Sequence, residues 1–171
     1  MESFWSNAPG ASLRQGDYIL DCPIPVLFEL PSEIEEQSFP IAVYYLIVMT
    51  QSCDLENEKA AFVALCPIYA LAEFEEANSS FARKGEWENV RKGRIEGLHM
   101  LGSLTNPTNN RESLVVDFRE IYSLPFDFLT HHAEQQGERW RLNSPFLEHF
   151  SQAFARFFMR VGLPCAIPPF R

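Results

Sequence analysis

A group of side chains able to do chemistry follows directly on the apolar run 41–49: Thr50, Gln51, Ser52, Cys53 and Asp54. A cysteine can act as a nucleophile when a base activates it, and neighbouring donors can stabilise an oxyanion. The carboxylate of Asp54 disfavours a thiolate, so the base must come from elsewhere, and His99 in the sequence GLHML is the best candidate. These residues predict an enzyme site with a Cys53–His99 pair, or with Asp54 as an acid/base carboxylate.

The same residues have a plainer interpretation, which stays open. A small cysteine at the end of a core strand often packs as an ordinary apolar residue. Thr, Ser and Asp beside it would then make only local turn hydrogen bonds. A zinc site built from Cys22, Cys53, Cys66 and His99 is disfavoured, because closely spaced cysteine pairs are missing. We expect no metal and no cofactor.

Basic residues concentrate around one tryptophan: Arg83, Lys84, Trp87, Arg91, Lys92 and Arg94. This segment predicts a surface that binds an anion or nucleic acid, with Trp87 as a stacking ring. The alternative is a solvated helix of mixed charge with Trp87 packed inward. His149, Gln152, Arg156 and Arg160 share one face of the last helix, which suits a phosphate or carboxylate, or simply the negative end of the helix dipole. We favour the dipole interpretation for this second group.

Composition narrows the class of protein. The chain has 171 residues, a size typical of one domain, and 46% of them are hydrophobic. Its formal charge of −9 repels phosphate backbones, so a protein partner is favoured over nucleic acid. The longest apolar run, nine residues, is far too short to cross a bilayer. With no targeting signal visible and only scattered cysteines, we expect a cytoplasmic protein.

Several strands should position these residues. After a loose leader over 1–13, strands are predicted at 16–22, 41–49 and 60–68. The second and third are almost continuously apolar, which predicts strands covered on both faces and paired as an antiparallel hairpin. Glutamates and Pro31 make 29–38 an exposed connection between the first two strands.

The second half mixes helices and strands. Helices are expected within 71–93, followed by a hairpin of 94–101 with 113–124, the latter half-exposed because its apolar residues alternate. A helix should follow Pro125, and 139–142 should form a last short strand. A phenylalanine stripe predicts a helix over about 145–161. The expected fold is mainly β (α+β): a small antiparallel barrel over about 14–142 with a helical insertion, in one domain.

Four segments resemble the MazF/PemK-like family: QGDYI (15–19), LIVMT (46–50), VALCPI (63–68) and SLVVDFREIYSLP (113–125). The resemblance implies an SH3-like barrel and, as the family's activity, cleavage of mRNA. The family's arginine falls at about Tyr44 and its Ser or Thr at about Tyr69. Tyrosine cannot supply the permanent positive charge that stabilises the phosphate while RNA is cleaved.

We therefore predict a non-catalytic module that binds a protein partner, in a toxin–antitoxin-like or phage-defence setting implied by the resemblance. Two alternatives stay open: an enzyme that uses residues 50–54, and a residual RNA-binding or ribonuclease activity. A homodimer is also left open.

Overall fold

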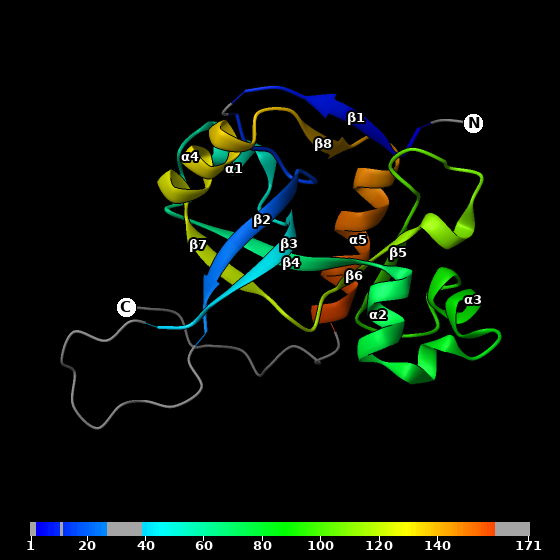
Figure 1. Ribbon diagram of the computed structural model, residues 1–171. Helices are drawn as coiled ribbons and strands as arrows, with labels where there is room; N and C mark the ends of the chain where they lie inside the picture. The colour runs from blue at the N-terminus through cyan, green and yellow to red at the C-terminus, as the bar shows by residue number, and fades with distance from the viewer. Residues whose placement is uncertain (1–2, 11, 27–38, 160–171) are drawn as a thin grey trace, which may run out of the picture.

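The computed structural model describes residues 3–10, 12–26 and 39–159 (Figure 1). Its strands are β1 (Trp5–Ala8), β2 (Tyr18–Pro25), β3 (Ile41–Val48), β4 (Phe62–Ala70), β5 (Leu98–Leu101), β6 (Leu114–Asp117), β7 (Tyr122–Pro125) and β8 (Arg139–Leu142). Its helices are α1 (Ser52–Glu56), α2 (Leu71–Ala77), α3 (Glu86–Arg91), α4 (Phe126–Gln136) and α5 (Phe146–Phe158), with 3₁₀ turns η1 (Ser79–Ala82) and η2 (Asn110–Glu112). The predicted α+β class with a mainly β core is confirmed.

The main sheet is antiparallel and open. Its strand order is β2-β3-β4-β6-β5, and β7 also pairs with β4. The two predicted hairpins are confirmed, with Ile47 opposite Cys66 and His99 opposite Val116. Because β2 and β5 lie at the two ends of this order, the expected barrel is not closed by strand pairing in the described residues. The core is completed instead by Phe150 of α5 and by Trp5 of the small β1–β8 sheet.

The first residues are not a loose leader. Trp5–Ala8 pair with Arg139–Leu142, and the Trp5 indole N–H donates to the carbonyl oxygen of Gly102 at 2.8 Å. The buried carboxylate of Asp17 accepts hydrogen bonds from Arg139 and Arg141, with an Nε–Oδ2 distance of 2.8 Å to Arg139. Arg139 also donates to the carbonyl oxygens of residues 10 and 12. This ion cluster ties the N-terminal segment to β2 and β8.

Two other expectations about strands are corrected. The first half of β3 is not covered on both faces, since Ile41 and Val43 are 65% and 60% exposed. The predicted strand 113–124 is interrupted: β6 and β7 run along the same edge of β4 and are separated at 118–121. β6 is fully buried rather than half-exposed. The interruption leaves Arg119 free to fold back onto Asp117, with Nε 2.8 Å from Oδ1.

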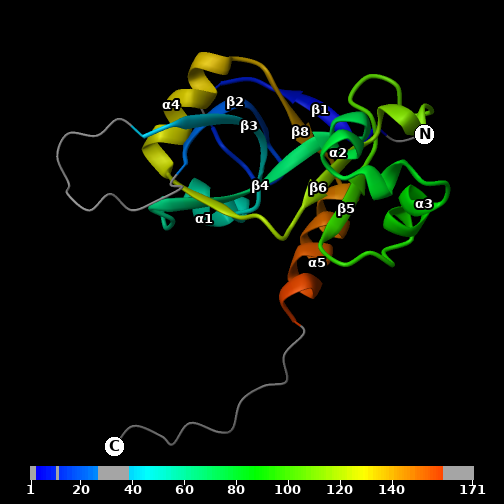
Figure 2. The same ribbon diagram turned by 60° about the horizontal axis from the view of Figure 1, so that its bottom comes forward.

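The helices between β4 and β5 form a small core of their own. Phe74 of α2 and Val90 of α3 pack with Leu98 and Val115 of the sheet. On another part of the molecule, α5 buries Phe150 and places Phe154 against Phe118. Figure 2 shows α3 and α5 flanking β5. The expected connection 29–38 and the end of the helix predicted over 145–161 lie outside the described residues.

Candidate functional site

The residues of the predicted Cys53–His99 pair lie apart. Cys53 is exposed on α1, whereas His99 lies on β5, and Figures 1 and 2 both show these elements on opposite sides of the molecule. Among the residues that the structure describes, the partners of the Cys53 thiol are local: its sulfur lies 3.7 Å from Gln51 Oε1 and 3.8 Å from Asp54 Oδ1. The structure therefore offers no imidazole from His99 to activate this thiol.

The neighbouring polar residues support the turn. Thr50 Oγ1 accepts a hydrogen bond from the backbone N–H of Ala64 at 2.8 Å. Ser52 Oγ accepts one from the backbone N–H of Gln15 at 3.1 Å. These bonds join the end of β3 to β4 and to the segment before β2. They match the plainer interpretation of the sequence, in which Thr and Ser make structural hydrogen bonds at a strand exit.

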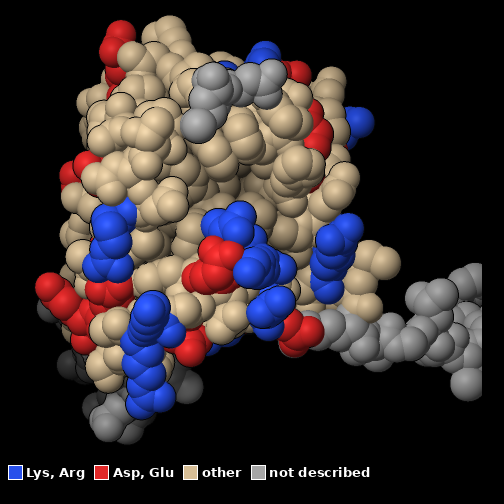
Figure 3. All heavy atoms as spheres, turned by 90° about the vertical axis from the view of Figure 1, so that its right-hand side faces the viewer, with Lys and Arg blue, Asp and Glu red and all other residues tan. Residues whose placement is uncertain are grey.

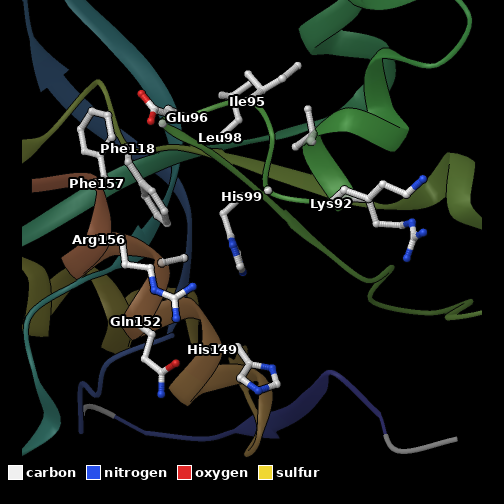
Figure 4. Close-up of a pocket in the computed structure, with 15 residues that line it drawn as sticks. Lys92, Ile95, Glu96, Leu98, His99, Phe118, His149, Gln152, Arg156 and Phe157 are labelled. Atoms are coloured by element: carbon white, nitrogen blue, oxygen red, sulfur yellow. The ribbon is translucent and has the colours of Figure 1, made fainter. Parts of the chain in front are cut away.

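A larger site surrounds His99. A groove of about 650 Å³ opens between the loop that leads from α3 into β5 and the outer side of α5. We call it the His99 groove, and its polar side chains are Arg91, Lys92, Glu96, His99, His149, Gln152 and Arg156. Figure 4 shows His99 pointing from β5 toward α5, from which the side chains of His149, Gln152 and Arg156 extend. Lys92 comes from the opposite, α3 side of the groove.

His99 is the floor of the groove and is neutral at physiological pH. Its ring lies 5.9 Å from the ring of Phe118 and 5.7 Å from that of Phe150. The pKa of His99 is lowered to about 4, mainly by burial among these rings and to a smaller extent by the charge of His149. A neutral imidazole has one N–H donor and one acceptor nitrogen. His99 can therefore hydrogen-bond a ligand without adding a full charge.

Gly97 lets β5 approach α5 closely. Its backbone has φ of +85°, a left-handed conformation that side chains disfavour. A Cβ at this position would lie 2.8 Å from Arg119 Cγ and 3.1 Å from Phe157 Cε2. Glycine is thus required here for both backbone conformation and space. The tight packing fixes the entry to β5 and so the position of His99 two residues later.

The α5 wall presents hydrogen-bond donors at one helical face. His149, Gln152 and Arg156 follow each other at spacings of three and four residues, so they lie along the same side of α5. Arg156 and His149 are exposed, and Arg156 has no hydrogen-bond or ion-pair partner among the described residues. A guanidinium that lacks an anion beside a hollow is suited to a phosphate or carboxylate.

The α3 wall adds two more cations, which are already paired. Arg91 Nε lies 2.7 Å from Glu88 Oε2, and Lys92 Nζ lies 2.9 Å from Glu88 Oε1. Such exposed pairs are weak and can exchange for a ligand. Figure 3 shows the wider setting: Lys and Arg side chains gather on one face of the molecule, with a few carboxylates between them.

The sequence identified this site only in part. Arg91 and Lys92 were predicted to bind an anion, and they line the groove together with His99. Arg83, Lys84 and Arg94 from the same prediction are exposed but do not line it. Trp87 packs against Phe74 and Phe81 and donates to Glu75 Oε1 at 2.6 Å, so it offers no free ring for stacking.

The helix face of α5 was visible in the sequence but was attributed to the helix dipole. The face becomes a wall of the groove because β5 lies across from it, and this approach of two distant segments has no signature in the spacing of residues. The spacing of His149, Gln152 and Arg156 was the available signal.

Tyr44 and Tyr69 lie together in a separate hollow. These are the positions where the MazF/PemK-like resemblance would require an arginine and a Ser or Thr.

No group of three or more His, Cys, Asp or Glu side chains suited to hold a metal occurs in the described part of the chain. Among the same residues, every helix is too short or too polar to cross a membrane. No protein-family model matches the chain, and no curated protein matches its sequence.

Proposed function

We propose that the protein binds a phosphate-bearing ligand in the His99 groove without cleaving it. The observation that carries this proposal is the position of Arg156. Its guanidinium, which has no partner among the described residues, shares a groove with His149, Gln152 and the neutral His99. Charge-assisted hydrogen bonds from arginine to phosphate are among the strong polar interactions of proteins.

Phosphate fits the groove better than a carboxylate does. Donors approach from three directions: the α5 wall, the α3 wall and the floor at His99. A phosphate group offers three or four oxygens to such donors, whereas a carboxylate offers two in one plane. Apart from the carboxylate of Glu96, the remaining lining is apolar; it includes Phe118 and Phe157 and leaves room for a non-phosphate part of the ligand.

Two sources of phosphate are consistent with this chemistry, a mononucleotide and an RNA strand. The test measures binding by titration calorimetry at low salt, with a nucleoside 5′-monophosphate and with a short single-stranded oligoribonucleotide as probes. We expect one of the two to bind, and Arg156→Gln to weaken that binding by at least about tenfold. Arg83→Gln, which changes an exposed arginine outside the groove, is the matched control.

The proposal fails if neither probe binds, or if Arg83→Gln weakens binding as much as Arg156→Gln. Gel analysis of the oligoribonucleotide after incubation with the protein tests whether the bound ligand is left uncleaved. Specific cleavage that is lost in His99→Phe would show that the groove is a catalytic site and would overturn the non-catalytic proposal.

A second candidate function is binding of a protein partner. Large apolar side chains are exposed at alternate positions along β3 and just before it: Phe39, Ile41, Val43 and Tyr45. Exposed apolar groups that lie together are typical of interaction surfaces. The resemblance to the MazF/PemK-like family is the basis for proposing a toxin–antitoxin-like or phage-defence setting for this partner. A second copy of the chain, which would make a homodimer, is one alternative partner. Light scattering after gel filtration tests self-association, and a monomer at high micromolar concentration would remove the homodimer.

A further inference from the structure

A second recess, distinct from the His99 groove, lies where β3 and β4 separate. The two strands pair only over Leu46–Val48 and Leu65–Pro67. From that short ladder β3 continues along β2 toward Ile41, while β4 continues beyond Pro67 along β6. Figure 1 shows β3 running away from β4. The side of β3 that faces β4 therefore has no strand partner at residues 41–45 within the described structure.

Two adjoining hollows occupy this opening, which we call the tyrosine cleft. One, of about 300 Å³, is lined by Asp21, Tyr44, Tyr45, Tyr69 and Glu73 among others. The second, of about 220 Å³, shares Tyr69 and Glu73 with it and extends to Asp117, Arg119 and Glu120. Each is at or below the size of an ordinary small-molecule pocket. Two small hollows side by side fit successive side chains of one extended segment better than a single compact ligand.

Aromatic rings gather at the cleft. Three of the five tyrosines of the chain line it, and a fourth, Tyr122, packs on Tyr44 with ring centroids 5.1 Å apart. The face of an aromatic ring carries partial negative charge and attracts cations. Tyrosine in particular combines a large contact area with few rotatable bonds, which is why it is common at interaction surfaces.

The cleft is also negatively charged. Four carboxylates line the two hollows, Asp21, Glu73, Asp117 and Glu120, against one cation, Arg119. That cation is held by Asp117 through two hydrogen bonds, at 2.8 and 2.5 Å. Asp21 and Glu73 are exposed and have no ion-pair partner among the described residues. Burial raises the pKa of the Tyr69 phenol, and the nearby charges of Glu120 and Asp117 raise it further.

We propose that the tyrosine cleft binds an extended basic segment of a partner protein, with Lys or Arg side chains in its two hollows. The cations would lie against tyrosine rings and pair with Asp21 and Glu73. The unpaired side of β3 offers backbone donors and acceptors to the same segment, as in strand addition. This inference rests on the second proposed function, protein binding, and names the chemistry of the partner. The cleft shares no lining residue with the His99 groove, whose ligand is an anion.

The test uses the full chain and three synthetic peptides of about eight residues, the length of an ordinary strand. One alternates lysine with valine, the second has glutamine for each lysine, and the third has glutamate. Fluorescence anisotropy at low salt should show binding of the lysine peptide, and that binding should weaken as salt is raised. Asp21→Asn and Glu73→Gln should each weaken it by up to about fivefold. Glu86→Gln, which changes a partly exposed carboxylate on α3 that lines neither hollow, is the control.

Failure of this inference can be separated from failure of protein binding. If the glutamine peptide binds as tightly as the lysine peptide, and Val43→Ser weakens both, the surface binds protein but the basic partner is wrong. The inference is overturned if the lysine peptide does not bind at all. It is also overturned if this peptide binds the double variant Asp21→Asn, Glu73→Gln as tightly as it binds the wild type. Thermal melting of each variant checks that the fold is intact.

Discussion

The neutral state of His99 should make the stability of this protein depend on pH. The pKa of His99 is about 4 in the folded protein, against an ordinary value of 6.5. At about 1.4 kcal/mol per pH unit, this difference corresponds to about 3 kcal/mol. Between these two pH values the unfolded chain binds the proton more readily than the folded one. The contribution is therefore fully present above about pH 6.5 and is lost as the pH falls toward 4.

The experiment compares the wild type with His99→Phe, which keeps an aromatic ring between Phe118 and Phe150. Urea unfolding is measured at about pH 7, 5.5 and 4, which brackets the titration of the imidazole. Carboxylates titrate in both proteins, so the difference between the two free energies of unfolding isolates His99. We expect the wild type to lose about 3 kcal/mol more than the variant. His131→Gln, on the exposed surface of α4, should leave the loss unchanged. Equal losses in wild type and His99→Phe would refute this account of the groove floor.

Three further predictions concern other parts of the fold. Asp17→Ala should lower the free energy of unfolding by about 3–5 kcal/mol, because it leaves a buried guanidinium unpaired; a loss under about 1 kcal/mol in urea unfolding would contradict this. Gly97→Ala should destabilise by about 1–3 kcal/mol and weaken nucleotide binding, and unchanged melting would show that the close packing with α5 is not required. A thiol reagent should modify Cys53 in the native protein but Cys22 and Cys66 only after unfolding, since burial raises their pKa values to about 11 and 12; peptide mass mapping that finds either of the latter modified first would reject the burial.

The sequence predicted the elements whose pattern is local. The apolar runs of β3 and β4 and the turn between them were enough to predict their antiparallel pairing, and the spacing of phenylalanines located α5. β1 was not predicted from the sequence, because only its end residues, Trp5 and Ala8, are buried and four residues are too few to show an alternating pattern. Its stability comes from pairing with β8, more than a hundred residues away.

The site was harder to predict because it joins segments that are distant in sequence. His99 was identified as a candidate but was paired with Cys53, because a thiol nucleophile needs a base. That pairing took account of chemistry and not of position in the fold. The structure places it opposite His149 and Arg156 instead. Likewise the tyrosine cleft depends on where β3 and β4 diverge. The residue pattern of neither strand indicates the position at which they separate.

The most direct test of the account is NMR of the histidine side chains during titration with a nucleoside 5′-monophosphate. We expect the imidazole resonances of His99 and His149 to shift together, and the pKa of His99 to rise above 4 because the bound phosphate favours the protonated ring. Arg156→Gln should abolish most of this response, while His131 should stay unchanged in both proteins. Resonances of His99 and His149 that do not move at saturating nucleotide would contradict the proposal that this groove is a phosphate site.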